Sequence, residues 1–329
     1  MTKGKIMAMS LIIVVTLPLC SQASALEEIV VGYFPAWPTP NLVGQIDGTF
    51  DSEMGIPLKW RLFESSWDMN QAFETGELDI AIGHEIVPFL HAAGNDLPVV
   101  ATGIAVSYPE YDNCIVSVHS GIDRDNIKQL EGEAVYTITG TLTHYRMVKM
   151  LEHLGVDPAS MELHAVGDGT AVSKAVYKGW AALGCAYAGP LERMLESGQF
   201  LMSGQELENI GLRYFDLITM SRSFLENNHE LARQFMAITD RFNRQYDSAP
   251  GPMKSAIAQG AGLRVIVANR ILQKFSFPSA REQKSGHWLG DGGVIENDLP
   301  ELASFLAVHG NLDKPLSSYG EFIDTGLLE

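Results

Sequence analysis

The stretch AVYTITGTLTHYRMVKMLEHL, residues 134–154, decides the fold of this chain. Residues 134–138 have an apolar strand pattern, and a helix over 142–154 follows almost at once. Thr141 stands where a helix N-cap belongs, because its hydroxyl can accept a backbone N–H of the first turn. The apolar side chains of one side of the helix recur every three residues: Leu142, Tyr145, Val148 and Leu151. A strand that runs directly into a helix is typical of α/β proteins.

Strands and helices alternate on both sides of this stretch. Further strands are expected over 28–34, 58–63, 78–82, 161–165 and 181–187. Further helices are expected over 41–53, 68–75, 86–93, 171–178 and 190–196. This alternation predicts two α/β units, each with a mostly parallel sheet that helices cover on both faces. The helices expected over 229–246, 252–258 and 263–275 would cover these sheets rather than begin a third domain.

The first 25 residues have the pattern of a secretory signal peptide. Two lysines precede an apolar run over 6–19, and small residues follow up to Ala25. We predict cleavage after Ala25 and export to the periplasm. No later stretch has the roughly 18 consecutive apolar residues of a membrane-spanning helix.

The chain has three cysteines, and each raises a question. Cys20 would allow a lipid anchor, but such a cysteine needs a small residue before it and Leu19 is large. Cys114 and Cys185 remain after cleavage, in a compartment where disulfides form. The sequence does not give the distance between them, so a disulfide stays open. The preferred interpretation is two buried thiols that behave as small apolar side chains.

The composition excludes two classes of partner. Lys and Arg total 23 against 40 Asp and Glu, and the formal net charge is −17. A chain this acidic does not suit nucleic acid or an anionic membrane surface. Apolar residues make up 46% of the chain, which predicts a sizeable packed core.

Sequence motifs of catalysis are absent. There is no nucleophile elbow, no phosphate-binding loop and no dinucleotide-binding glycine pattern. His84 and Glu85 are followed by Ile86, Val87 and Pro88, so they do not begin a zinc-protease motif. We therefore predict a binding protein rather than an enzyme, with no cofactor and no metal ion.

The junction over 139–145 is the leading candidate for a binding site. Its backbone N–H groups, the hydroxyls of Thr141 and Thr143 and the positive end of the helix dipole would together form a cradle for an anion. A sulfonate, a phosphonate or a carboxylate would fit there. The alternative is that the two hydroxyls only satisfy the first turn of the helix, and spacing alone does not decide between these roles.

A set of segments points to a known family through its order and spacing. The segments are Thr143-His144-Tyr145 with the run 148–156, the run 75–80 before Gly83, Gly132 before the strand at 134, and Phe215-Asp216. Together they resemble the periplasmic taurine- and alkanesulfonate-binding proteins of ABC importers, within the wider group related to thiamine-precursor binders. The resemblance covers most of residues 28–245. It implies the α/β fold of type II periplasmic binding proteins, with two lobes and a ligand cleft between them.

The resemblance also implies how the chain is divided. Lobe 1 would comprise residues 26–112 and 219–329, and lobe 2 residues 113–218. A ligand that contacts both lobes would favour their closed arrangement, which an ABC permease in the inner membrane would recognise. Receptors of this kind usually act as monomers, and we expect a monomer here.

The roles of several residues follow from the same resemblance. The residues placed at the anionic headgroup are Thr141, Thr143 and His144. Asp216 is placed at the ammonium end, where it would form a charge-assisted hydrogen bond; a helix cap or a hinge salt bridge is its alternative role. The chain departs from the family pattern at Glu85, whose charge would repel a sulfonate unless His84 or a bound ammonium offsets it.

Aromatic residues gather where the expected strands end: Phe34, Trp37, Trp67, Tyr108, Tyr111 and Tyr187. Several of these rings would form a box for a methylated ammonium or sulfonium. Core packing or a plain cleft wall is the alternative. The full set of predicted ligand-binding residues is Phe34, Trp37, Trp67, His84, Glu85, Tyr111, Asn113, Thr141, Thr143, His144, Tyr187 and Asp216.

These features predict a periplasmic receptor for a small zwitterionic sulfonate, taurine first, that delivers its ligand to an ABC permease. One alternative keeps the receptor but changes the ligand to a quaternary ammonium or sulfonium zwitterion, or to an aminophosphonate. The other alternative is an exported enzyme on the same scaffold.

Overall fold

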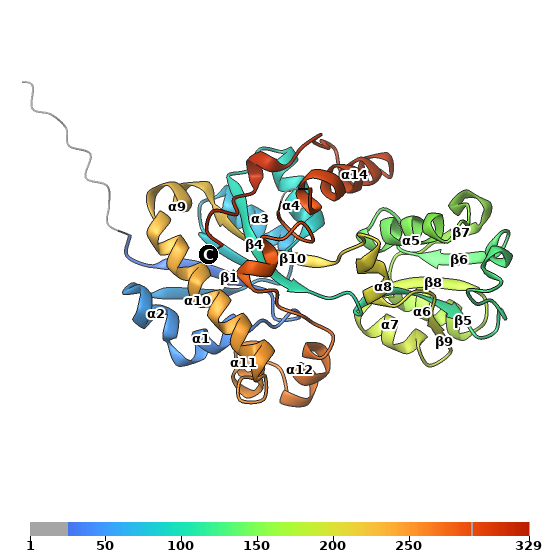
Figure 1. Cartoon of the computed structure of the whole chain (residues 1–329), viewed down its shortest axis with the longest axis horizontal. Helices are drawn as coiled ribbons and strands as arrows, with labels where there is room; N and C mark the ends of the chain where they lie inside the picture. The colour runs from blue at the N-terminus through green and yellow to red at the C-terminus, as the bar shows by residue number, and fades with distance from the viewer. Residues whose placement is uncertain (1–25, 291, 329) are drawn as a thin grey trace, which may run out of the picture.

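Two five-stranded sheets, each covered by helices, form the two lobes of the chain (Figure 1). The computed structural model describes residues 26–290 and 292–328. The predicted signal peptide lies outside the described residues. Among the described residues, no helix has both the length and the apolar composition to cross a bilayer.

The sheet of lobe 1 has the strand order β2-β1-β3-β10-β4. Its strands are β1 (Ile29–Tyr33), β2 (Leu58–Leu62), β3 (Ile80–Glu85), β4 (Val99–Ser107) and β10 (Phe215–Ser221). β1 pairs in parallel with β2 and β3, whereas β10 runs antiparallel to both β3 and β4. Four of the five strands of this sheet therefore point the same way, and the expectation of a mostly parallel sheet is confirmed. β10 enters the sheet from the other lobe, so it runs against its neighbours.

The sheet of lobe 2 repeats this arrangement in the order β7-β6-β8-β5-β9. Its strands are β5 (Asp112–Ser117), β6 (Ala134–Thr137), β7 (Glu162–Ala165), β8 (Leu183–Tyr187) and β9 (Gly198–Phe200). β6 is parallel to β7 and β8, and β5 is antiparallel to β8 and β9. β5 is again the strand that arrives from the opposite lobe.

Helices cover both faces of each sheet (Figure 1). Lobe 1 carries α1 (Asn41–Asp47), α2 (Thr49–Met54), α3 (Ser66–Glu74), α4 (Ile86–Gly94), α9 (Arg222–Asn227), α10 (His229–Ser248), α11 (Lys254–Gly260), α12 (Val265–Leu272), α13 (Ala280–Gln283) and α14 (Val294–Val308). Lobe 2 carries α5 (Leu142–His153), α6 (Gly169–Tyr177), α7 (Ala188–Met194) and α8 (Gly204–Asn209). The single helix expected over 41–53 is two helices, because Gly48 adopts a left-handed conformation with φ of 73° and ends α1.

The cores explain why these elements stay together. In lobe 1, Phe50 stacks on Phe235 of α10 with ring centroids 4.9 Å apart, within one continuous cluster of buried apolar side chains. Lobe 2 has two smaller clusters, one under α5 around Met150 and one under α6 and α7 around Val176. The chain passes between the sheets from β4 to β5 and from α8 to β10, and α14 packs against α5.

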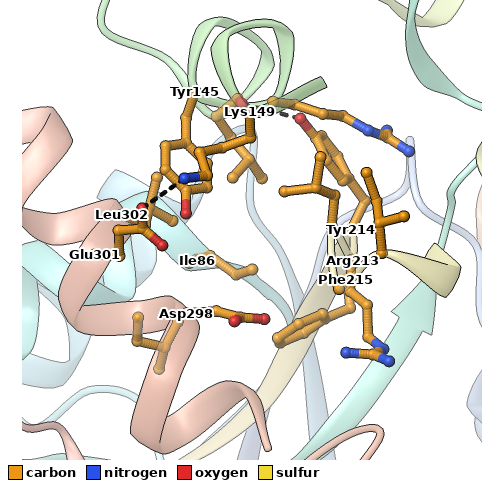
Figure 2. A pocket seen from close by; sticks show the side chains of 15 residues that line it. Ile86, Tyr145, Lys149, Arg213, Tyr214, Phe215, Asp298, Glu301 and Leu302 are labelled. Carbon is orange, nitrogen blue, oxygen red and sulfur yellow. Dashed lines mark hydrogen bonds and ion pairs between the residues drawn. The ribbon is translucent and has the colours of Figure 1, made fainter. Parts of the chain in front are cut away.

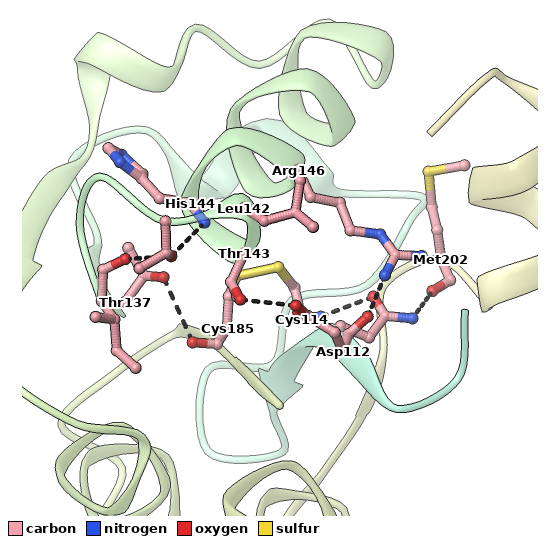
Figure 3. Close-up of a disulfide and its surroundings, with 12 residues drawn as sticks. Asp112, Cys114, Thr137, Leu142, Thr143, His144, Arg146, Cys185 and Met202 are labelled. Carbon is pink, nitrogen blue, oxygen red and sulfur yellow. Dashed lines mark hydrogen bonds between the residues drawn. A yellow bond between two sulfur atoms is a disulfide. The ribbon is translucent and has the colours of Figure 1, made fainter. Parts of the chain in front are cut away.

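Cys114 and Cys185 form a disulfide inside lobe 2 (Figure 3). β5 and β8 are paired so that these residues stand directly opposite one another, with Cα atoms 4.0 Å apart. The preferred interpretation of two separate thiols is therefore wrong. The pairing depends on the register of two strands about 70 residues apart in the sequence, which local patterns do not reveal.

Candidate ligand-binding site

A cavity of about 520 Å³ lies between the lobes. The junction of β3 and α4 lines it from lobe 1, and the junction of β6 and α5 lines it from lobe 2. Ligands of α/β proteins bind at such carboxyl ends of strands. The predicted residues that line the cavity are Trp37, Trp67, Glu85, Thr141, Thr143 and Tyr187.

The remaining predicted residues do not line it: Phe34, His84, Tyr111, Asn113, His144 and Asp216. Phe34 and Tyr111 pack edge-on against the Trp37 ring, at centroid distances of 6.1 and 5.3 Å. They therefore support the cavity wall from behind. Asn113 is buried, where its side chain donates to the carbonyl oxygen of Met202 and accepts the N–H of Cys114. Whether any of them contacts a ligand stays a prediction.

His84 and His144 are both buried. The Nδ1 atom of His84 lies 2.9 Å from the hydroxyl of Thr219, and burial lowers the pKa of His84 to about 3. In His144, Nδ1 accepts the N–H of Gly140 over 3.1 Å, and burial together with the nearby His309 lowers the pKa to about 4. Both imidazoles are thus neutral near pH 7, so His84 does not offset the charge of Glu85.

The N-terminus of α5 carries the predicted anion cradle (Figure 3). Thr141 caps the helix: its hydroxyl accepts the N–H of His144 over 3.2 Å and donates to the carbonyl oxygen of Ile138 over 2.7 Å. The Thr143 hydroxyl instead donates to Oδ2 of Asp112 over 2.8 Å. The backbone N–H groups of Thr141, Leu142 and Thr143 make no hydrogen bond to any other described residue. These amides, rather than the hydroxyls, are the free donors of the cradle.

Two carboxyl groups line the cavity, and a third lies directly behind it. Burial raises the pKa of Glu85, and the Ser66 hydroxyl opposes that rise. Burial also raises the pKa of Asp112 to about 7, although the positive charge of Arg146 lowers it. Asp216 stands opposite Glu85 on the paired strand β10, and burial and the charge of Glu85 raise its pKa well above the ordinary value.

Tyr108 separates Asp216 from the cavity. Its hydroxyl donates to Oδ1 of Asp216 over 2.8 Å, while Oδ2 has no hydrogen-bond partner among the described residues. Tyr108 itself lines the cavity and stacks on Trp37 at a centroid distance of 5.3 Å and an interplanar angle of 21°. Asp216 could contact the ammonium end of a ligand only if the Tyr108 side chain moved aside. The predicted role of Asp216 therefore stays a prediction.

The prediction also missed two polar residues of the cavity wall, Asp112 and Asn311. Asp112 begins β5 and pairs directly with Tyr187 of the neighbouring strand β8. The available signal was an acidic residue at the boundary expected between the two lobes, residues 112 and 113. Asn311 follows α14 and reaches Gly140 in lobe 2. Nothing in its local sequence indicates a site.

A second, smaller cavity of about 120 Å³ lies between α5 and α14 (Figure 2). At its edge, Lys149 Nζ lies 2.8 Å from Glu301 Oε1, which links the lobes by an ion pair. Burial raises the pKa of Asp298 in this wall to about 6, and Arg213 opposes the rise. Within the described part of the chain, no group of three or more His, Cys, Asp or Glu side chains could hold a metal ion.

Comparison with known proteins places this geometry in a family. A curated relative, the taurine-binding periplasmic protein of Escherichia coli (strain K12), is 22% identical over 297 residues, covering 88% of this chain and 89% of the relative. The crystal structure of the aliphatic sulphonate binding protein SsuA from Escherichia coli matches with a TM-score of 0.67 and 14% identity, over 92% of this chain and 99% of that chain.

The desulfurization enzyme DSZB also shares the fold, with a TM-score of 0.61 and 12% identity over 92% of this chain and 98% of that chain. These structural matches confirm the expected two-lobed α/β fold. The model of the family described as NMT1/THI5 like matches residues 39–242, more than half of the chain. This chain is a member of the NMT1/THI5-like family.

Proposed function

We propose that this chain is the substrate-binding protein of an ABC importer, exported to the periplasm, and that it binds a small zwitterionic sulfonate of the taurine type. The curated relative is named for taurine binding in the periplasm, and its match extends over most of both chains. The structural match to a sulphonate-binding protein is consistent with the same class of ligand.

One observation carries the proposal. Thr141, Leu142 and Thr143, the residues with the three unbonded amides at the start of α5, line the interlobe cavity together with Glu85. A helix N-terminus with free N–H groups binds an anion, and a carboxylate binds an ammonium. A short zwitterion therefore meets a complementary group at each end.

The transport role follows from the position of the cavity. The expected division into two lobes is kept, but its boundaries move by a few residues, because Asp112 begins β5 in the sheet of lobe 2 and Phe215 begins β10 in the sheet of lobe 1. We place lobe 2 at residues 112–214 and lobe 1 at the residues before and after it. A ligand that contacts both lobes stabilises the closed arrangement by its difference in affinity for the closed and open states. The closed receptor, acting as a monomer, would then deliver its ligand to a permease of the inner membrane.

We propose binding rather than catalysis, although the fold alone does not decide, because a desulfurization enzyme shares it. The naming of the curated relative supports the binding role. Incubation of the protein with taurine for a day, followed by NMR of the solution, tests this point. Intact taurine is expected, and appearance of sulfite or another product would contradict the proposal.

Thermal unfolding in the presence of taurine, ethanesulfonate, 2-aminoethylphosphonate and glycine betaine tests the ligand class. A ligand at about one hundred times its dissociation constant adds about 2.7 kcal/mol to the free energy of unfolding. We expect the largest rise in melting temperature with taurine. If no sulfonate raises it, the sulfonate assignment is wrong.

A quaternary ammonium zwitterion is the second candidate, favoured by the rings in the cavity wall. Trp37, Trp67, Tyr108 and Tyr187 all line the cavity with Glu85. Aromatic faces attract methylated ammonium groups by cation–π interaction. Stronger stabilisation by glycine betaine than by taurine would favour this candidate.

A further inference from the structure

The interlobe cavity has an unbalanced set of charges. Glu85 and Asp112 line it, and no lysine or arginine is among its described lining residues. Both carboxyls act on the same phenols, since the charges of Glu85 and Asp112 each raise the pKa of Tyr108 and of Tyr187. The two acidic groups therefore lie around one part of the cavity, although they belong to different lobes.

The backbone explains how they meet. Glu85 is the last residue of β3 in the sheet of lobe 1 and precedes α4. Asp112 is the first residue of β5 in the sheet of lobe 2, directly after the first crossover. Any movement of one lobe relative to the other changes the distance between these carboxyls.

Asp112 has an unused acceptor. Its Oδ2 accepts the hydroxyl of Thr143, and its backbone carbonyl oxygen accepts a guanidinium N–H of Arg146. Its Oδ1 is buried and has no hydrogen-bond partner among the described residues. A buried acceptor without a donor is unfavourable, so the site as it stands lacks one hydrogen-bond donor.

Arg146 is not that donor. Its guanidinium donates to the backbone carbonyl oxygens of Asp112 and Pro109 and lies over the Tyr214 ring, 3.7 Å from the centroid. Arg146 does not line this cavity. Asp112 is also a lining residue of the cavity, where Trp37, Tyr108 and Tyr187 present surfaces that favour a cation. A ligand cation that enters there is a candidate for the missing donor.

We propose that one positively charged nitrogen of the ligand bridges Glu85 of lobe 1 and Asp112 of lobe 2, and that this bridge draws the lobes together. Without the cation, two like charges on opposite lobes resist closure. With the cation between them, the same carboxylates attract a common partner. The proposal uses the cavity of the proposed function, but it does not require the anionic end of the ligand to be a sulfonate.

Calorimetry on the mature chain tests the bridge with taurine and with ethanesulfonate, which lacks the nitrogen. We expect taurine to bind at least about tenfold more tightly than ethanesulfonate. Glu85→Gln and Asp112→Asn should each weaken taurine binding by about tenfold or more and leave ethanesulfonate binding nearly unchanged. Equal binding of the two probes, or unchanged taurine affinity in both variants, would overturn the bridge while leaving a sulfonate receptor intact.

Glu208→Gln is the matched control. Glu208 is also a partly buried carboxyl with a raised pKa and accepts a hydroxyl, that of Ser107, but it does not line the cavity. It should leave taurine affinity unchanged. Thermal unfolding without ligand checks that all three variants are folded.

Glycine betaine and putrescine separate the bridge from the sulfonate assignment. If no sulfonate binds but one of these cations binds and loses affinity in both Glu85→Gln and Asp112→Asn, the bridge stands and the sulfonate assignment fails. If neither taurine nor these cations bind, the bridge is wrong. Small-angle scattering adds a structural readout, because the bound wild type should compact and the two variants should not.

Discussion

Asn311 holds Gly140 across the boundary between the lobes. The Asn311 side chain follows α14 of lobe 1, and its Nδ2 donates to the carbonyl oxygen of Gly140 over 3.0 Å. Gly140 lies in the turn that leads into α5 of lobe 2 and has a φ of 70°. A Cβ added at Gly140 would stand 1.6 Å from Asn311 Nδ2, so any other residue here would displace the Asn311 side chain. The C-terminal segment thus fixes the turn from which the cavity amides project.

Gly140→Ala should lower the free energy of unfolding by about 1–3 kcal/mol, because the positive φ disfavours a Cβ and the new methyl meets Asn311. Urea unfolding measures the change. Asn311→Ala removes the clash but not the backbone strain. The double variant should therefore be more stable than the sum of the two single changes predicts. Strict additivity would show that the two residues are not in contact.

Local and long-range features differ in how far the sequence predicts them. The sequence predicts α5 within one residue of its observed end at His153, because its cap at Thr141 and its apolar spacing are local. It misses the placement of Asp112 and Asn311 in one cavity, since that depends on which strands become neighbours. Asp216 was expected at the cavity, yet the hydroxyl of Tyr108, distant in sequence, covers it.

Removal of the disulfide should destabilise lobe 2 without removing the binding site. The disulfide between Cys114 and Cys185 joins residues 71 positions apart in the sequence, and a disulfide of this kind typically adds about 2–4 kcal/mol to the free energy of unfolding. Cys114→Ala with Cys185→Ala should lower the free energy of unfolding by that amount. Neither cysteine lines the cavity, so taurine affinity well below the melting temperature should stay unchanged. A loss of affinity in the folded double variant would contradict this separation.

Asp112→Asn should stabilise the ligand-free protein at high pH. The native carboxyl has a pKa of about 7, against an ordinary value of 3.8, so between these values the native state holds a proton that the unfolded chain has lost. Stability therefore falls as pH rises through this window. Asparagine does not ionise, and the variant should be about 1–3 kcal/mol more stable than the wild type at pH 8.

The comparison must use the difference between variant and wild type, because other groups have the opposite dependence. His84 and His144 have native pKa values of about 3 and about 4, below the ordinary value of 6.5. The stability that these two histidines contribute is lost as pH falls from 6.5 toward their native pKa values. This loss is the same in the wild type and in Asp112→Asn. Urea unfolding at pH 4.5 and pH 8 should show the gain from Asp112→Asn only at the higher pH. An equal gain at both would point to packing instead of charge.

Taurine binding should strengthen as pH rises from 6 to 8 in the wild type, because the cation requires an ionised Asp112. Arg146 and Thr143 favour that ionised form, whereas burial disfavours it. Calorimetry in two buffers with different ionisation enthalpies should detect protons released on binding at pH 7. In Asp112→Asn the release should be smaller. Proton uptake in the wild type would mean that Asp112 becomes protonated and donates to the anion.

Thr141→Val should affect stability more than binding. The Thr141 hydroxyl already caps α5 and donates to Ile138, so its removal should lower the free energy of unfolding by about 1 kcal/mol. The free amides of the first turn remain, and they are the groups that hold the anion, so affinity should fall less than about threefold. Thr141→Ser keeps the hydroxyl and should match the wild type in both respects. A tenfold loss with valine that serine restores would show that the hydroxyl, and not the backbone, contacts the headgroup.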